Sequence, residues 1–161
     1  MLGKGDTIPN LKLKNHSRNE IHLHDYLGKG PIVLFFYPKN ETPGCLAEAC
    51  EFRDHFDDFL ELGAQVVGIS ADTADSHERY RKKYGFLFQL LSDSEKKAEK
   101  AFRLKRNLFG LLPGRVTFVC DKNGVILDSF ESATQVKKHA RNALQIIKQE
   151  IKKDHDQVKN P

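Results

Sequence analysis

Two of the three cysteines of the chain lie five positions apart, in the segment TPGCLAEAC at residues 42–50. Cys45 directly follows a Thr-Pro-Gly turn, and Cys50 closes the segment. A pair of this kind can form a disulfide, bind a metal ion, supply a reactive thiol, or pack as two small apolar residues. These four possibilities place different demands on the rest of the sequence.

Metal binding and simple packing explain the pair poorly. A zinc site needs about four ligands at recognisable spacings, but the chain has no second cysteine pair and its seven histidines are scattered. Packing as a small apolar residue suits Cys120, which lies in the apolar run VTFVC. It suits Cys45 less well, because this residue falls in the first turn of a predicted helix.

The start of a helix favours the ionised form of a thiol, because free N–H groups and the helix dipole stabilise an anion there. Lowering a thiol pKa from ~8.5 to ~6 requires ~3.4 kcal/mol, whereas a helix dipole supplies only ~0.3–1 kcal/mol. Thr42 can add a hydroxyl donor, and the nearest cation, Arg53, lies about two helical turns beyond Cys45. We therefore expect the missing positive charge to come from elsewhere in the fold.

Cys45 and Cys50 are too far apart for a disulfide while both are helical. On an ideal α-helix, positions i and i+5 have Cα atoms ~8.7 Å apart, and a disulfide rarely tolerates more than ~7 Å. Oxidation of the pair would therefore require local unwinding. The spacing also argues against a thioredoxin-type reductase, whose two-residue spacing closes without unfolding.

The surrounding pattern predicts the elements that position this segment. We expect an edge hairpin over 11–23 and a central strand over 31–37 that ends at Pro38, followed by a helix to about residue 62 that Gly63 stops. A strand over 64–70, a helix closed by Gly85 and a strand over 88–93 come next, and then a helix over 94–102 with a capping box from Ser92 to Glu95. The chain ends with a hairpin over 115–130 turned at Asn123-Gly124 and a long C-terminal helix capped by Thr134.

Strands that alternate with helices and end in an antiparallel hairpin describe a three-layer α/β/α domain with a mixed sheet. The 161 residues are enough for one domain, 1–161, of which about 152–161 form a polar tail that we expect to be frayed. The net charge of +4 comes from dispersed Lys and Arg, which disfavours nucleic-acid binding. We find no membrane span or signal peptide, and therefore expect a cytoplasmic protein.

The segment YPKNETPGCLAEACEFRD closely resembles the active-site segment of peroxiredoxins of the Q type, the bacterioferritin-comigratory-like subfamily. The family signature of Pro, three residues, Thr, two residues, Cys falls on Pro38, Thr42 and Cys45, and the family's resolving cysteine falls on Cys50. The resemblance continues through residues 66–93 and 108–126, where the family's active-site arginine matches Arg115. It spans roughly residues 5–148.

The resemblance implies a thioredoxin-like fold with an N-terminal β-hairpin extension and a peroxidase that needs no cofactor. Cys45 would attack hydrogen peroxide or an organic hydroperoxide and become a sulfenic acid. Arg115 would be the absent cation and, with the Thr42 hydroxyl and the Cys45 N–H, would hold the peroxide, while Pro38 would shield the thiolate from water. Cys50 would then form the disulfide, which a thioredoxin-like protein would reduce. Relatives are commonly monomers or weak dimers.

At four positions, the chain either departs from the family pattern or has a residue whose role the resemblance does not decide. Leu46 follows the nucleophile where the family often has Thr, and Cys120 replaces a different residue and is interpreted as core. Glu48 matches an acidic position that either bridges to an arginine or remains a solvated carboxylate in the first turn. From physics alone, Arg53 is as readily structural as catalytic.

Two other functions remain as alternatives. A disulfide oxidoreductase acting on proteins is disfavoured by the spacing of the cysteines. A redox-sensing or chaperone-like module could use the same pair, with oxidation exposing apolar surface, and could coexist with peroxidase activity. Kinetics distinguish a peroxidase from a redox sensor, because a peroxidase consumes hydroperoxide catalytically whereas a sensor is oxidised once per chain.

Overall fold

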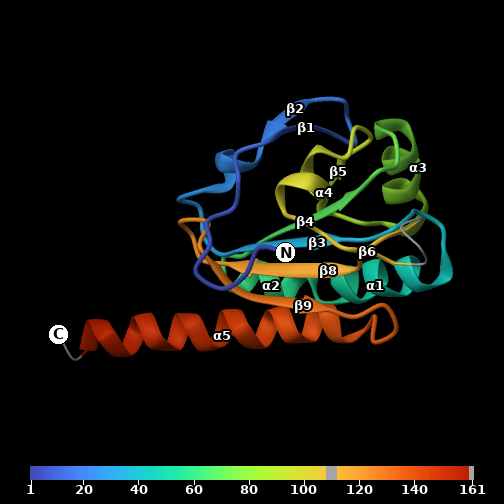
Figure 1. Cartoon of the computed structure of the whole chain (residues 1–161). Helices are drawn as coiled ribbons and strands as arrows, with labels where there is room; N and C mark the ends of the chain where they lie inside the picture. Colours follow the sequence, from blue (N-terminus) through green and yellow to red (C-terminus); the bar gives the residue numbers. More distant parts are fainter. Residues whose placement is uncertain (108–111, 160–161) are drawn as a thin grey trace.

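The fold is built around a seven-stranded mixed sheet, with the strand order β2-β1-β5-β4-β3-β8-β9 (Figure 1). The computed structural model describes residues 1–107 and 112–159. Strands β3, β4 and β5 are parallel to one another, and β1, β2, β8 and β9 join antiparallel at the two sides. The strands of this sheet are β1 Lys12–Asn15, β2 Glu20–His22, β3 Ile32–Phe36, β4 Gln65–Ser70, β5 Gln89–Ser92, β8 Val116–Cys120 and β9 Ile126–Glu131.

The strand before the cysteine pair, β3, lies in the middle of the sheet. All five of its residues are buried, because β4 pairs with one of its edges, β8 pairs with the other, and helices or loops cover both faces. This confirms the central strand predicted from the unbroken apolar run. A short separate pair, β6 Arg106–Asn107 with β7 Leu112–Pro113, flanks residues 108–111. The part of the family resemblance on 108–111 lies outside the described residues.

Helices cover both faces of the sheet in the three-layer arrangement of a thioredoxin-like fold (Figure 1). Three helices, α1 Pro43–Asp54, α2 Phe56–Glu61 and α5 Lys138–Lys159, lie on one face. The other face is covered by α4 Lys97–Ala101, the 3-10 helix η1 Leu23–Tyr26 and the N-terminal segment, while α3 Ala74–Tyr84 packs against β5 and β1.

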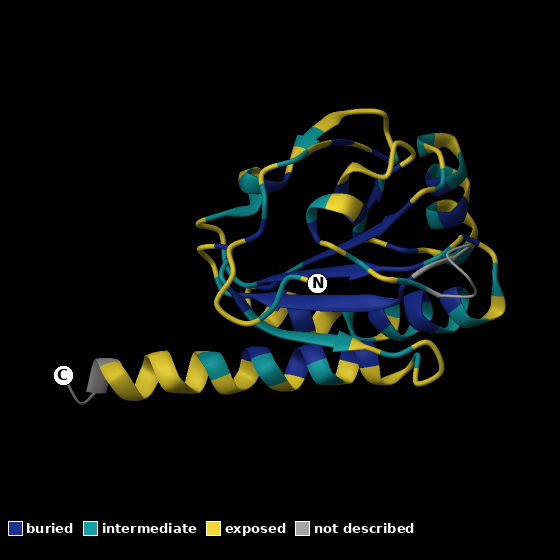
Figure 2. Ribbon diagram, viewed as in Figure 1, coloured by how far each residue is buried: buried dark blue, intermediate teal, exposed yellow. Residues whose placement is uncertain are grey.

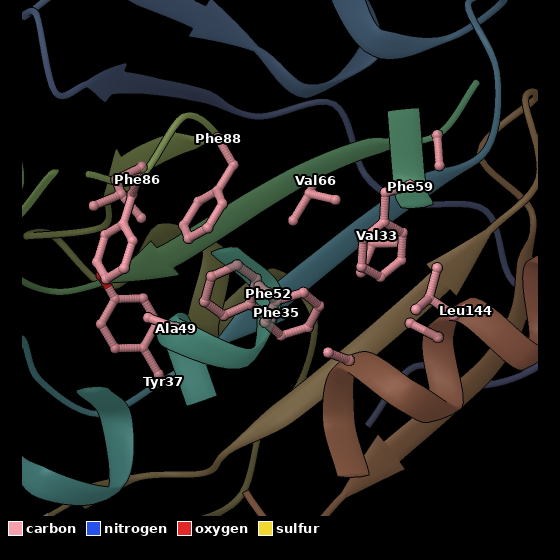
Figure 3. Packing of buried hydrophobic residues seen from close by; sticks show 14 of the residues in the cluster. Val33, Phe35, Tyr37, Ala49, Phe52, Phe59, Val66, Phe86, Phe88 and Leu144 are labelled. Carbon is pink, nitrogen blue, oxygen red and sulfur yellow. The ribbon is translucent and has the colours of Figure 1, made fainter. Parts of the chain in front are cut away.

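Aromatic side chains fill the core between the sheet and α1 (Figure 3). Phe35 of β3 stacks on Phe52 of α1 with ring centroids 4.2 Å apart, and Phe52 stacks in turn on Phe59 of α2 at 5.9 Å. Phe88 meets Phe35 edge-on at 5.5 Å. These contacts bury the apolar stripe of α1 and so fix the rotation of the helix that carries both cysteines.

The predicted helix over residues 43–62 is interrupted. His55 ends α1 and precedes α2, with φ −98° and ψ 7°. Its ring nitrogens lie 3.6 Å from Glu51 and 3.2 Å from Asp58, so the side chain contacts both helices at the bend. Gly63 follows α2 with φ 69°, as expected for a helix stop.

The predicted capping box at Ser92–Glu95 is wrong. Ser92 belongs to β5, where it pairs with Lys14 and Ser70, and its hydroxyl donates to the Asp72 carbonyl. The carboxylate of Asp93 instead accepts from the N–H groups of Ala98 and Glu99 at 2.8 and 2.9 Å. The next residue along thus satisfies the free N–H groups at the start of α4 because the sheet has already engaged Ser92.

The C-terminal helix differs from its prediction at both ends. It begins at Lys138 rather than after Thr134, because the Ser132 hydroxyl accepts from the Gln135 N–H and a turn comes first. It continues to Lys159, where a frayed tail was expected from residue 152. Figure 2 shows buried residues in the first half of the helix, alternating with exposed ones, and exposed residues along its C-terminal part. Among the described residues, no helix is long and apolar enough to span a bilayer.

Candidate active site

Cys45 lies in the first turn of α1 and is only 1% exposed. Thr42 precedes the helix, Pro43 is its first residue, and the first helical bond runs from the Leu46 N–H to the Thr42 carbonyl at 2.8 Å. The N–H of Cys45 therefore precedes the intrahelical bonds and remains available as a donor. A sulfur at this place lies in the positive field of the helix N-terminus.

Arg115 lies next to this sulfur, 70 positions away in the chain. Its Nη2 donates to Cys45 Sγ at 3.4 Å, and the residue is 8% exposed. The register of the sheet brings Arg115 close to Cys45, because β8 pairs antiparallel with β3 and Val116 lies opposite Phe36. The residue before β8 therefore lies beside the chain that leaves β3 for α1. The cation that the cysteine segment lacks is supplied from this neighbouring strand.

Glu48 lies one helical turn after Cys45 and is fully buried. Its Oε1 lies 3.5 Å from Nη1 of Arg115, and its Oε2 lies 3.4 Å from Nε2 of His139. Burial raises the pKa of Glu48 to about 8 even though the charge of Arg115 acts to lower it. Of the two interpretations that the sequence left open, the solvated first-turn carboxylate is therefore wrong.

His139, on α5, extends this buried cluster away from the sulfur. Its Nδ1 lies 2.8 Å from the Thr117 hydroxyl, and its Nε2 lies 2.9 Å from the Ser132 carbonyl. Burial, together with the charge of Arg115, lowers the pKa of His139 to about 4. The ring is therefore neutral at physiological pH.

Thr42 and Pro38 lie on the loop between β3 and α1. The Thr42 hydroxyl donates to the Lys39 carbonyl at 2.8 Å, so it stabilises the loop rather than the sulfur in the structure as it stands. Pro38 directly follows Tyr37, where the chain leaves the sheet, and is half-buried. Both lie on the loop that leads to Cys45, where the family signature places them.

Asn40 anchors this loop to α3. Its backbone N–H donates to the Asp72 carboxylate at 2.9 Å, and its side-chain amide lies 3.1 Å from the Ser76 hydroxyl and 3.0 Å from Nδ1 of His77. The Tyr37 hydroxyl donates to its side-chain oxygen at 2.6 Å. These bonds hold the loop in one conformation and so help to determine where α1 begins.

The neighbouring residue Glu41 has a positive φ of 66°, which is uncommon for a residue with a side chain. The Tyr84 hydroxyl donates to its carboxylate at 2.8 Å, and Lys83 contacts the same oxygen at 3.4 Å. Two residues at the end of α3 thus hold the backbone in this conformation just before Thr42. Such locally strained backbone is frequent at functional sites.

Cys50 lies on the same helix but in a different environment. It is partly buried, and burial raises its pKa although the charge of Arg53 acts to lower it. Both residues of the pair are free thiols within the uninterrupted α1. Arg53 donates to the Tyr84 carbonyl at 2.9 Å, which ties α1 to the end of α3 and indicates a structural role.

Cys120 lies in the core, as its apolar run predicts. It is fully buried in β8, and burial raises its pKa to about 12. Leu46 is half-buried and packs against the core cluster near α1. In the ranges 1–107 and 112–159, no three His, Cys, Asp or Glu side chains are grouped closely enough to hold a metal ion.

Sequence reasoning missed His139 and Asn40. The signal for His139 was its position, because residues 139, 143 and 147 lie on one buried face of α5, and a histidine on a buried apolar stripe needs polar partners. Asn40 carried no comparable signal, since Asn is common in loops between a strand and a helix. Its partners come from the loop after β4 and from α3, which only the fold brings close.

The arrangement is suited to chemistry at sulfur. A thiolate at Cys45 would have a guanidinium on one side and the helix N-terminus on the other, so its charge would be stabilised without exposure to bulk water. The same donors could also stabilise negative charge on an oxygen bound beside the sulfur. The site thus combines a cysteine placed to act as a nucleophile with hydrogen-bond donors that can bind an anion beside it.

Comparisons with known proteins agree with this description. The sequence profile of the AhpC/TSA family matches residues 4–129. Peroxiredoxin Q, chloroplastic, from Sedum lineare is 44% identical over 144 residues, which cover 89% of this chain and 77% of that protein. The corresponding protein from Triticum aestivum is 44% identical over 146 residues, with 91% of this chain and 67% of that protein covered.

Solved structures of similar proteins have the same fold. Peroxidoxin BcpB from Mycobacterium tuberculosis superposes with a TM-score of 0.86 at 37% identity, covering 92% of this chain and 97% of that one. A cysteine-to-serine variant of Xylella fastidiosa PrxQ superposes with a TM-score of 0.85 at 31% identity, covering 94% and 98%. Bacterioferritin comigratory protein of Xanthomonas campestris, described for its alkyl peroxide reduction activity, has a TM-score of 0.79 at 30% identity, covering 87% and 91%.

Proposed function

The chain belongs to the AhpC/TSA family as a peroxiredoxin of the Q type, and from this premise we propose that Cys45 is the residue with which it reduces hydroperoxides. Members of this family are thiol-dependent peroxidases, and so is this protein. The observation that carries the assignment to Cys45 is the 3.4 Å contact between its sulfur and Arg115 at the start of a helix.

The first half of the reaction takes place at the sulfur of Cys45. The thiolate attacks the terminal oxygen of the hydroperoxide, an S–O bond forms, and the O–O bond breaks. The sulfur is oxidised to a sulfenic acid, and the leaving oxygen departs as hydroxide or alkoxide and takes a proton to become water or an alcohol. Cys45 is buried, so bulk water does not compete for the thiolate.

Arg115 and the start of α1 stabilise the charge that moves during this step. Negative charge shifts from the sulfur to the leaving oxygen, and donors on both atoms stabilise the transition state more than the ground state. Arg115 and the N–H of Cys45 are placed to donate. The Thr42 hydroxyl can join them by turning from the Lys39 carbonyl to a bound peroxide, and Pro38 limits access to the sulfur.

The second half uses Cys50. Its thiol attacks the sulfenic sulfur of Cys45, a disulfide forms, and water leaves. The ideal-helix separation of ~8.7 Å requires α1 to unwind before this step. A thioredoxin-like protein then reduces the disulfide by thiol–disulfide exchange and restores both thiols. No prosthetic group takes part in this sequence.

Hydrogen peroxide and organic hydroperoxides are the proposed substrates, and the alkyl peroxide reduction described for the Xanthomonas campestris relative supports the second class. We also propose a monomer or weak dimer with no nucleic-acid or membrane partner. The large apolar side chains exposed in the described part, Met1, Leu60, Leu87 and Ile151, come from separate elements, which supports this. A reducing compartment such as the cytoplasm suits the three free thiols.

The decisive experiment measures peroxide consumption with thioredoxin and its reductase. The wild-type chain should turn over many equivalents of hydrogen peroxide, and Cys45→Ser should consume none. Full activity in Cys45→Ser would refute the assignment. Oxidation of the wild type by a single equivalent, without turnover, would instead favour the redox sensor.

A further inference from the structure

We propose that His139 is a positioning residue for the peroxidase reaction, which holds the carboxyl group of Glu48 against Arg115 and so keeps the guanidinium directed at Cys45. The proposal deepens the function proposed above and rests on it. His139 is fully buried, and its Nε2 lies 3.4 Å from Oε2 of Glu48. It acts on the reacting sulfur through Glu48 and Arg115.

The contacts of His139 determine which ring nitrogen carries the proton. The Ser132 carbonyl can only accept, and it lies 2.9 Å from Nε2, so Nε2 is the protonated nitrogen. Nδ1 is then the acceptor for the Thr117 hydroxyl at 2.8 Å. The neutral ring therefore donates its Nε2–H to the Ser132 carbonyl, and Oε2 of Glu48 lies 3.4 Å from the same nitrogen. Burial supports this neutral form by lowering the pKa of His139.

Glu48 is confined from two sides. Arg115 from the edge of β8 and His139 from α5 approach its two oxygens at 3.5 and 3.4 Å. Neither oxygen has a hydrogen bond of good geometry among the described residues. A fully buried carboxyl group with such long contacts is costly to fold, and groups of this kind concentrate at functional sites.

The cluster connects three elements that meet only in the folded chain. Glu48 comes from α1, Thr117 from β8 and His139 from α5, while Ser132 follows β9 and the Phe130 ring of β9 packs edge-on against the His139 ring at 4.7 Å. Arg115 is the charged group that faces them. Loss of the His139 ring would remove the group that lies 3.4 Å from Oε2 of Glu48 and let the guanidinium shift, and small errors in alignment slow a reaction strongly.

Single-turnover oxidation of Cys45 by hydrogen peroxide, followed in a stopped-flow instrument without reductant, tests this role. Alkylation of the same thiol by iodoacetamide is measured in parallel, because it needs the thiolate but not the alignment of a peroxide. His139→Leu preserves the apolar volume and removes both nitrogens, whereas His139→Gln keeps an N–H that can reach Glu48. The matched control is Phe130→Leu, which alters packing on the ring but removes no polar contact.

We expect His139→Leu to slow the peroxide reaction by about tenfold or more and the alkylation much less, as for loss of an aligned donor. His139→Gln should recover part of the peroxide rate, and Phe130→Leu should lose stability but keep the ratio of the two rates. If His139→Leu does not fold, Thr117→Val tests the same point, because it releases the Nδ1 side of the ring; a loss of about threefold in the ratio is expected.

The proposal would be overturned by a wild-type ratio of peroxide to alkylation rates in folded His139→Leu, or in Thr117→Val where His139→Leu does not fold. If both rates had fallen equally, the unchanged ratio would indicate a general structural role. Failure of the proposed function has a different signature, because the wild-type chain itself would then leave Cys45 unoxidised.

Discussion

A Cβ atom added to Gly44 would lie 3.1 Å from Nη2 of Arg115, the same nitrogen that donates to the sulfur of Cys45. The guanidinium is thus packed against the backbone of the first turn of α1 on one side and against the sulfur on the other. A glycine directly before the nucleophile lets the arginine approach this closely. The relationship makes the position of the guanidinium sensitive to a single methyl group.

We predict that Gly44→Ala slows the peroxide reaction without destabilising the fold. The guanidinium must move by a few tenths of an ångström, which corresponds to a loss of roughly threefold to tenfold in rate, while alanine stabilises a helix relative to glycine. Stopped-flow oxidation and urea unfolding measure the two quantities. Gly3→Ala, where an added Cβ meets nothing within 4 Å, is the control. An unchanged rate of Cys45 oxidation in Gly44→Ala would show that the guanidinium can shift to accommodate the methyl group without slowing the reaction.

Arg115→Ala should slow the oxidation of Cys45 by about a hundredfold or more, the usual effect of removing a donor to developing negative charge. Arg115→Lys should rescue only part of the rate, because an ammonium group is a point charge and cannot serve Glu48 and Cys45 in parallel. The exposed Arg79→Ala is the charge control. An unchanged oxidation rate in Arg115→Ala would show that another group stabilises the developing charge.

Cys50→Ser should react once with peroxide and then stop. We expect a sulfenic acid at Cys45, detected by mass spectrometry after dimedone labelling, and loss of thioredoxin-linked turnover. Wild-type protein should instead form a Cys45–Cys50 disulfide and lose helical circular dichroism, since α1 must unwind. Cys120→Ser should behave as the wild type, because burial raises the pKa of that thiol to about 12. A disulfide between Cys45 and Cys120 would contradict this scheme.

Glu48 should make the protein less stable as the pH rises from about 4.5 to about 8. Its pKa is raised from 4.5 to about 8, so the folded state binds more protons than the unfolded chain between these values. The stability that protonated Glu48 contributes is therefore complete below pH 4.5 and is lost as the pH rises toward about 8. His77 and His139 have the opposite effect on stability, because burial lowers the pKa of both from 6.5 to about 4. Their contribution makes the protein more stable as the pH rises from about 4 to 6.5.

The interval from pH 6.5 to 8 consequently isolates Glu48. Over this interval, the free energy of unfolding of the wild type should fall relative to that of Glu48→Gln by at most ~2 kcal/mol, at 1.36 kcal/mol for each pH unit. Urea unfolding of both proteins at several pH values measures the difference. Parallel profiles would show that Glu48 is ionised in the folded protein throughout the interval.

Local patterns predicted the elements of this fold well. The apolar run of β3, the turn at Asn123-Gly124 and the stop at Gly85, with φ 69°, all appear where the sequence places them. The errors concern where helices begin, break and end. Ser92 and Asp93 both have side chains that can accept hydrogen bonds from the N–H groups at the start of a helix. Ser92 is paired within β5, so the carboxylate of Asp93 accepts these bonds instead.

The sequence by itself determined the location of the nucleophile, because a thiol after Thr-Pro-Gly lies at a helix N-terminus whatever surrounds it. It also determined that one helix carries Cys45 and Cys50 and cannot join them without unwinding. Only the tertiary structure decided which side chains surround the sulfur. The register of β3 with β8 brings Arg115 to it, and the packing of α5 brings His139 to Glu48. Local patterns act over a few residues, whereas these contacts depend on how distant segments share one core.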